Sequence, residues 1–125
     1  MQNLPHYQLY IDGQWCAGGG QQTIESIDPS KGTTWMTFDC ANENDIDRAV
    51  QGAKRMLDDP QWRDISQTAR GKILYRLADL IEENADIIGT AETQDSGKLL
   101  SETTSQTKYV ADYYRGSAGV DEKSR

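Results

Sequence analysis

The N-terminal part of the chain consists of short apolar and polar runs separated by turn residues. Residues 7–11 are rich in aromatic and β-branched side chains, and residues 14–17 form a second run around Trp15. Asp12-Gly13 lies between the two runs, and both residue types tolerate the positive φ angles of a tight turn. The pattern therefore predicts a β-hairpin.

Two further short strands are expected after the hairpin. They cover residues 23–27 and 34–38, and the Pro and Gly residues within 28–32 predict a turn between them. We expect the strands over about residues 7–40 to be small and antiparallel. The glycine run at 18–20 does not open a helix, as a phosphate-binding loop must, so we interpret it as a flexible connection.

From about residue 42 onward, apolar side chains recur with the spacing of amphipathic helices. Asn42 and Asp45 have the spacing of a capping box, which predicts the start of a first helix, and Pro60 ends that helix. Its apolar stripe is formed by Ile46, Ala49, Val50, Ala53 and Leu57. This stripe must be buried against another surface.

Three more helices are expected, which gives about four over residues 42–119. Ser66 caps the second helix, residues 84–86 separate it from the third, and Gly97 ends the third. The fourth covers about residues 102–118. The predicted fold class is α/β, with short N-terminal strands followed by helices.

A chain of 125 residues is long enough for one domain. Leu, Ile, Val and Phe make up less than a fifth of it and the net charge is −7, so few residues are available for a core. The helices either pack on each other as a bundle or cover one face of a parallel sheet supplied by further sequence. An ordered pattern with so few core residues is typical of a part of a larger domain.

Composition excludes several function classes. No apolar run exceeds three residues, so neither a membrane-spanning helix nor a signal peptide is predicted. The chain is acidic and its Lys and Arg residues are scattered, so we expect no nucleic-acid partner. Cys16 and Cys40 lack the spacing of a disulfide framework or a zinc site, which favours a reducing, cytoplasmic setting.

The residues by themselves indicate no catalytic group. Cys16 and Cys40 lie in or beside the expected strands, where small apolar side chains pack, and a nucleophilic thiol needs a neighbouring base. The only histidine, His6, is expected to be solvated. The acidic residues of the first helix lie at its ends or on its exposed face, without the spacing of an acid–base pair.

Six short segments occur along the chain in a specific order. They are residues 9–15, 25–32, 44–50 and 62–81, the motif Glu92-Thr93-Gln94-Asp95-Ser96-Gly97-Lys98, and the pair Tyr113-Tyr114. Each segment is common by itself, but together their order and spacing resemble the NAD(P)-dependent aldehyde dehydrogenase superfamily. The resemblance covers nearly the whole chain, but only about the first quarter of a typical family member.

The resemblance implies an N-terminal fragment of a Rossmann-like cofactor domain over residues 1–125, with the catalytic and oligomerisation parts absent. Family members oxidise an aldehyde to a carboxylic acid through a cysteine thiohemiacetal, with NAD or NADP as the hydride acceptor. Their catalytic cysteine, general-base glutamate, oxyanion asparagine and cofactor-binding turn lie in motifs that this sequence lacks. Cys16 and Cys40 match none of these motifs, so no catalytic or cofactor-binding residue is expected here.

One site of the family reaches into this segment. Many members hold Na⁺ or K⁺ between the N-terminal strand and the loop that carries the Asp of the motif around Asp95. The resemblance implies that the backbone carbonyls of Ser26 and Ile27 and the carboxylate of Asp95 are ligands, a set of oxygens that suits a hard cation. At least one further ligand is expected from sequence beyond this chain, and the alternative is that Asp95 caps or pairs locally.

Two hypotheses of function follow. In the first, the chain is the N-terminal portion of an aldehyde dehydrogenase and is inactive alone, and its parent is a homodimer or homotetramer that acts on a small-molecule aldehyde. In the second, the chain is a stand-alone helical interaction module derived from that family. The small supply of core residues favours the first hypothesis.

Overall fold

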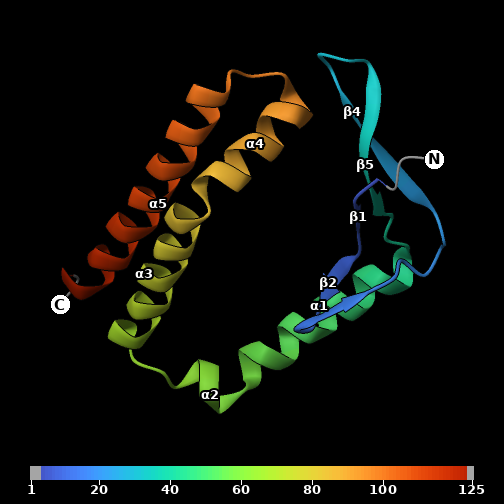
Figure 1. Ribbon diagram of the computed structural model, residues 1–125. Helices are drawn as coiled ribbons and strands as arrows, with labels where there is room; N and C mark the ends of the chain where they lie inside the picture. The colour runs from blue at the N-terminus through green and yellow to red at the C-terminus, as the bar shows by residue number, and fades with distance from the viewer. Residues whose placement is uncertain (1–3, 124–125) are drawn as a thin grey trace. The chain divides into compact units, whose positions relative to one another are not determined.

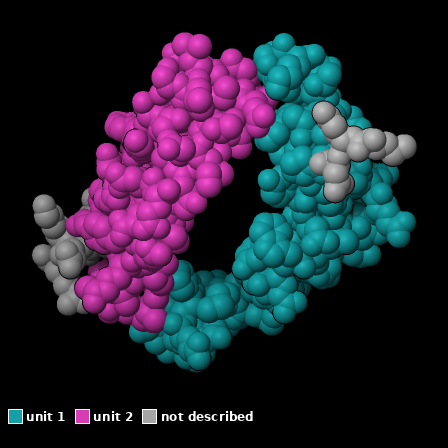
Figure 2. Space-filling model, viewed as in Figure 1, with its two compact units in different colours: residues 1–64 teal, residues 65–125 magenta. Residues whose placement is uncertain are grey.

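The computed structural model describes the backbone of residues 4–123 and the side chains of residues 4–119. The chain forms two compact units, Met1–Asp64 and Ile65–Arg125, which are coloured separately in Figure 2. The first unit contains strands β1 to β5 and helices α1 and α2, and the second contains helices α3 to α5 (Figure 1).

The first unit contains a two-stranded antiparallel hairpin of β2 (Leu9–Ile11) and β3 (Gln14–Cys16). Asp12 and Gly13 connect the strands with φ angles of 54° and 79°. These are the left-handed conformations that an Asp-Gly hairpin turn requires. The predicted hairpin is confirmed.

A three-stranded sheet has the strand order β1-β5-β4. As predicted, β4 (Thr23–Asp28) and β5 (Thr33–Asp39) pair antiparallel. The expectation that all strands are antiparallel is wrong for β1 (His6–Tyr7), which pairs with β5 in parallel. Residues 7–11 were expected as one strand, but the chain divides them between this sheet and the hairpin. Local alternation of apolar and polar residues does not show with which strand a segment pairs.

The turn between β4 and β5 is organised by Asp28, which is buried. Its Oδ1 accepts hydrogen bonds from the Ser30 amide at 2.9 Å and the Ser30 hydroxyl at 2.6 Å, and Lys31 Nζ lies 3.3 Å from Oδ2. The bonds from Ser30 lower the pKa of Asp28, because they stabilise the charged carboxylate. Gly32 completes the turn with a φ of 66°.

Helix α1 (Glu43–Asp58) begins with the predicted capping box. The Asn42 side chain accepts a hydrogen bond from the Asp45 amide at 3.0 Å, and the Asp45 carboxylate accepts one from the Asn42 amide at 3.0 Å. The break before Pro60 is also confirmed. Pro60 then starts a short helix, α2 (Pro60–Arg63), which the sequence pattern did not indicate.

The apolar stripe predicted for α1 is not buried within the first unit. Its largest side chains are more than half exposed: Ile46, Val50 and Leu57. The hairpin instead approaches α1 at Gly52, where an added Cβ would lie 3.1 Å from an Asp12 carboxylate oxygen. Arg55 of α1 forms an ion pair with Asp12 at 2.7 Å. Gly52 and the ion pair of Arg55 therefore take part in this contact, whereas Ile46, Val50 and Leu57 of the stripe remain more than half exposed.

The second unit consists of α3 (Gln67–Glu83), α4 (Ala85–Ser96) and α5 (Leu100–Lys123). Both α3 and α4 pack along α5 (Figure 1). The three predicted boundary residues are confirmed at the N-cap of α3, at the junction of α3 with α4 and at the C-cap of α4: Ser66, Asn84 and Gly97.

The interior of this helical unit is made of small side chains. Its fully or nearly fully buried residues include Ala78, Ala85, Thr103, Thr107, Ala111 and Ala118. Gly89 lets α4 approach α5 closely, since an added Cβ would lie 2.8 Å from the Thr104 amide nitrogen. At the edge of the unit, Arg115 of α5 forms ion pairs with Asp79 and Glu82 of α3.

The large apolar side chains of the helical unit lie outside this interior. They include Ile73, Leu77, Leu80, Ile87, Ile88, Tyr109, Val110 and Tyr113, all of which are exposed. Among the residues whose side chains are described, the buried hydrophobic residues of the whole chain are alanines only. No described helix is both long and apolar enough to cross a membrane. The large apolar side chains of the helical unit thus form exposed faces.

Candidate functional site

Ser26 and Ile27, two of the expected cation ligands, are neighbours on β4 at a β-bulge. Ser26 pairs with Met36 and Ile27 pairs with Thr34, so Trp35 is the extra residue on β5. Ser26 is buried, and its hydroxyl accepts a hydrogen bond from Trp35 Nε1 at 2.8 Å. The fold thus places Ser26 and Ile27 where the pairing of the strand is irregular.

Asp95, the third expected ligand, is exposed in the last turn of α4. Because α4 belongs to the second unit and β4 to the first, the structure describes the two parts of the expected site separately. Two carbonyl oxygens and a carboxylate are a donor set that suits Na⁺ or K⁺. Among the described residues, no group of three or more His, Cys, Asp or Glu side chains is arranged to hold a metal. The site at Ser26, Ile27 and Asp95 stays a prediction.

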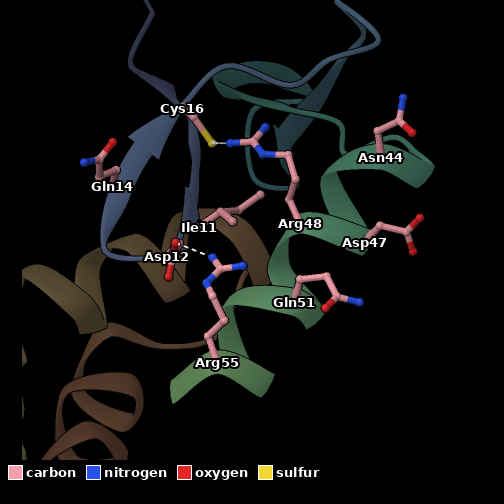
Figure 3. A pocket seen from close by; sticks show the side chains of 9 residues that line it. All are labelled: Ile11, Asp12, Gln14, Cys16, Asn44, Asp47, Arg48, Gln51 and Arg55. Atoms are coloured by element: carbon pink, nitrogen blue, oxygen red, sulfur yellow. Dashed lines mark hydrogen bonds and ion pairs between the residues drawn. The ribbon is translucent and has the colours of Figure 1, made fainter. Parts of the chain in front are cut away.

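A groove of about 480 Å³ lies between the hairpin and α1 in the first unit (Figure 3). Arg48 and Arg55 extend from α1 toward the hairpin across this groove (Figure 3). Arg55 pairs with Asp12, and Arg48 Nη2 donates a hydrogen bond to Cys16 Sγ at 3.7 Å. Arg48 also lies 3.3 Å from the Asp45 carboxylate. The contacts of Arg55 with Asp12 and of Arg48 with Cys16 join the hairpin to α1.

The two cysteines have structural contacts in this arrangement. Cys40 Sγ donates a weak hydrogen bond to the Ala41 carbonyl at 3.7 Å, and Cys16 Sγ accepts one from Arg48. Both are free thiols of intermediate exposure. A nucleophilic thiol needs a base in hydrogen-bond reach, and within the described part of the chain neither sulfur is bonded to a histidine or a carboxylate.

The glycine run is anchored, so its interpretation as a flexible connection is wrong. The Gly18 amide donates to Asp39 Oδ2 at 3.0 Å, and the Gly19 amide donates to Asp45 Oδ2 at 2.9 Å. Gly18 is buried, and an added Cβ there would overlap the Cys40 carbonyl oxygen. Both carboxylates are more than 20 residues away in sequence, so local composition carried no signal for them.

Asp45 is the centre of this anchoring and is buried. Its carboxylate accepts the Asn42 amide and the Gly19 amide, and these bonds lower its pKa because they stabilise the charged form. The capping-box spacing predicted the first bond. The second depends on the tertiary fold, and sequence reasoning missed it.

His6 is exposed, as expected, but it also contacts two side chains of β5. Its Nδ1 lies 2.8 Å from Thr37 Oγ1, and its Nε2 lies 3.1 Å from Asp39 Oδ1. The side chain remains 42% exposed, so these contacts lie at the surface. They depend on the parallel pairing of β1 with β5, which local sequence did not indicate.

Residues 15–125 match the aldehyde dehydrogenase family. The chain belongs to the aldehyde dehydrogenase family. An aldehyde dehydrogenase from Bacillus cereus, solved as a point mutant, is 27% identical with a TM-score of 0.91 over 96% of this chain and 25% of its own. The likeness confirms the α/β fold class.

Other relatives carry more specific names. The (Z)-2-((N-methylformamido)methylene)-5-hydroxybutyrolactone dehydrogenase of Acinetobacter baylyi is 40% identical over 120 residues, which are 96% of this chain and 24% of that protein. A point mutant of betaine aldehyde dehydrogenase from Staphylococcus aureus, solved in complex with NAD⁺, is 28% identical with a TM-score of 0.88 over 93% of this chain and 23% of its own. Cytosolic 10-formyltetrahydrofolate dehydrogenase of Xenopus tropicalis is 40% identical over 77% of this chain and 10% of that protein. This aldehyde dehydrogenase sequence thus spans a quarter or less of these relatives.

Proposed function

We propose that this chain is the N-terminal portion of an oxidoreductase that oxidises an aldehyde to a carboxylic acid with NAD⁺ or NADP⁺. The observation that carries the proposal is the family match over residues 15–125. The Acinetobacter baylyi relative aligns with nearly the whole chain yet extends about four times as far, which supports a larger parent protein. The S. aureus structure with NAD⁺ supports a nicotinamide cofactor.

In this proposal the chain is a supporting part of the cofactor domain and has no role at the reacting atoms. Family chemistry uses a cysteine that attacks the aldehyde, and hydride then leaves the resulting thiohemiacetal for the nicotinamide. The motifs that carry this cysteine and its general-base glutamate do not occur in residues 1–125. The contacts of Cys16 and Cys40 give neither thiol a base. The chain alone is therefore inactive.

The exposed apolar side chains of the helical unit support this proposal. Its small side chains hold α3, α4 and α5 together, and its large apolar side chains face outward. Amphipathic helices of α/β proteins bury such faces against a sheet. The remaining polypeptide of the enzyme covers these faces in the proposed parent, and it also brings the catalytic groups and the contacts between subunits.

A monovalent cation belongs to the same proposal. The carbonyls of Ser26 and Ile27 at the β4 bulge and the Asp95 carboxylate would hold Na⁺ or K⁺. Such an ion would supply a fixed positive charge to these oxygens. The support is the oxygen donor set and the irregular pairing at Ser26 and Ile27, together with the family match.

The test is a comparison of the chain alone with a fusion enzyme. In the fusion, residues 1–125 replace the matching quarter of the Acinetobacter baylyi relative, and both proteins are assayed for NADH or NADPH formation with a panel of aldehydes. The fusion is expected to be active and the 125-residue chain inactive. Replacing the relative's catalytic cysteine by Ser is the control for background reduction. Saturable activity of the chain alone, or a folded fusion without activity, would contradict the proposal.

A further inference from the structure

The groove between the hairpin and α1 is lined by a row of hydrogen-bond donors on the helix. Arg48, Gln51 and Arg55 follow one face of α1 at intervals of three and four residues. All three side chains lie at the groove, with Gln51 between the two arginines (Figure 3). Its volume of about 480 Å³ is in the range of small-molecule sites, about 300–1,000 Å³. The groove therefore has the size and the donors to bind a small polar ligand.

Arg48 is held in this groove by weak contacts. Its Nη2 lies 3.7 Å from Cys16 Sγ, and its Nη1 lies 3.3 Å from Asp45 Oδ1. A thiol sulfur is a weak acceptor, and a guanidinium bound closely to a carboxylate has shorter contacts of about 2.7–2.9 Å. The other oxygen of Asp45 already accepts two backbone amides. The Arg48 guanidinium thus has donors available for a stronger acceptor.

Two carboxylates also line the groove, and the described structure pairs neither of them with Arg48. Asp12 in the hairpin turn binds Arg55 at 2.7 Å, so these two charges offset each other. Asp47 is exposed on α1, and its carboxylate points away from the hairpin (Figure 3). The end of the groove beside Cys16 therefore presents the charge of Arg48 to a ligand.

We propose that this groove binds a small molecule through its oxyanion group, a carboxylate or a phosphate, at Arg48. The guanidinium fork donates two N–H groups to such an oxyanion, which is a stronger acceptor than the sulfur of Cys16. The amide of Gln51, one turn further along α1, supplies a neutral donor. The rest of the ligand lies along the groove toward Arg55. The ligand is bound without any covalent step.

The test is a titration of the 125-residue chain with inorganic phosphate and, separately, with succinate. The whole groove lies within the first unit, so the chain contains every group of the site. The reporter is the Nε–Hε resonance of Arg48 in the nuclear magnetic resonance spectrum. A saturable shift is expected, and added NaCl is expected to weaken it. A shift with phosphate alone supports a phosphate-bearing ligand, and a shift with succinate alone supports a carboxylate.

Three variants distinguish the groove from general charge attraction, with dissociation constants measured by calorimetry. Arg48→Gln is expected to weaken binding about tenfold or more, because charge-assisted hydrogen bonds are lost. Gln51→Glu leaves the contacts of Arg48 with the hairpin in place, and its negative charge is expected to weaken binding similarly. Lys54→Gln removes a positive charge from α1 outside the groove lining, and a change of about twofold or less is expected.

The outcome does not depend on aldehyde oxidation, because both measurements record binding. If the chain alone shows no shift, the fusion enzyme, which also contains these residues, is titrated in the same way. Absence of a saturable shift in both proteins would overturn the proposal. Equal losses of affinity in Arg48→Gln and Lys54→Gln would overturn it as well, since the anion would then respond only to the total charge of the chain.

Discussion

Single carboxylates determine how the glycine run is held. Asp39 and Asp45 each accept a backbone amide from this run, and Gly18 has no room for a Cβ beside the Cys40 carbonyl. A sequence of three glycines by itself favours a flexible connection. The tertiary bonds override this preference, because two buried or nearly buried carboxylates need donors and the glycine amides supply them.

Two glycines of the helical unit provide a matched pair of substitutions. At Gly89 an added Cβ would lie 2.8 Å from the Thr104 amide nitrogen, whereas at Gly116 nothing lies within 4 Å. Gly89→Ala is expected to destabilise the helical unit by about 1–3 kcal/mol, because α4 and α5 must separate. Gly116→Ala is expected to stabilise it by about 0.5–1 kcal/mol through helix propensity. Urea unfolding followed by circular dichroism measures both changes.

The opposite order of the two variants would contradict the packing of α4 on α5. Equal effects would show that Gly89 is not in a close contact. Because both substitutions are glycine to alanine within a helix, the difference between them isolates the contact with Thr104 from backbone effects.

At the scale of elements, the ends of helices and the hairpin turn could be predicted where the residues that form them lie within a few positions of each other in the sequence. Asn42 with Asp45, Ser66 and Gly97 each cap a helix through bonds to neighbours within the same turn. Asp12-Gly13 fixes the hairpin for the same reason. The parallel pairing of β1 could not be predicted, because β5 lies some 30 residues downstream and no local pattern selects it.

The attachment of α1 to the glycine run is expected to depend on pH. Bonds from the Asn42 and Gly19 amides lower the pKa of Asp45 below its ordinary value of 3.8. The stabilisation is therefore present above about pH 4 and is lost as the pH falls through the lower pKa of the folded state. Urea unfolding at several pH values between 5 and 2, followed by circular dichroism at 222 nm, measures the free energy of unfolding. This free energy is expected to fall less on acidification in Asp45→Asn than in the wild type.

The exposed Asp47 on the same helix provides the control. Asp47→Asn is expected to leave the acid dependence as it is in the wild type. If Asp45→Asn and Asp47→Asn behave alike, the buried carboxylate does not hold α1 to the glycine run.

At the scale of the whole molecule, the chain has the elements of a fold without a large apolar interior. Among the residues whose side chains are described, the buried hydrophobic ones are alanines, while Ile73, Leu77 and Tyr113 are exposed. The sequence indicated this imbalance through its few Leu, Ile, Val and Phe residues. The sequence pattern also predicted that the α1 stripe is buried, but its large side chains Ile46, Val50 and Leu57 are exposed. Which surface buries a stripe depends on the rest of the polypeptide and cannot be read from the stripe.

The candidate cation site was likewise predicted in part only. Sequence resemblance led to Ser26, Ile27 and Asp95, and the structure adds the bulge that sets Ser26 and Ile27 in irregular pairing. The bulge could not be predicted, because an extra residue in β5 has no mark in local composition.

Exposed apolar faces have a direct solution signature. The 125-residue chain is expected to bind the dye 1-anilinonaphthalene-8-sulfonate with severalfold higher fluorescence than the fusion enzyme, because the dye binds accessible apolar surface. The dye fluorescence of each protein, measured at the same molar concentration and divided by its number of residues, gives the comparison. Equal fluorescence from both proteins would show that the chain covers these faces without further polypeptide.

The central claim is that these residues work as part of a larger aldehyde dehydrogenase, and the mass of the polypeptide that contains them in the cell tests it most directly. An antibody raised against residues 1–125 can detect the polypeptide in extracts of the source cells, and its mass is read after denaturing electrophoresis. The account predicts a polypeptide about four times the 14.0 kDa of this chain, as its 24% share of the Acinetobacter baylyi relative implies. A polypeptide of 14.0 kDa would contradict the account and favour the stand-alone interaction module.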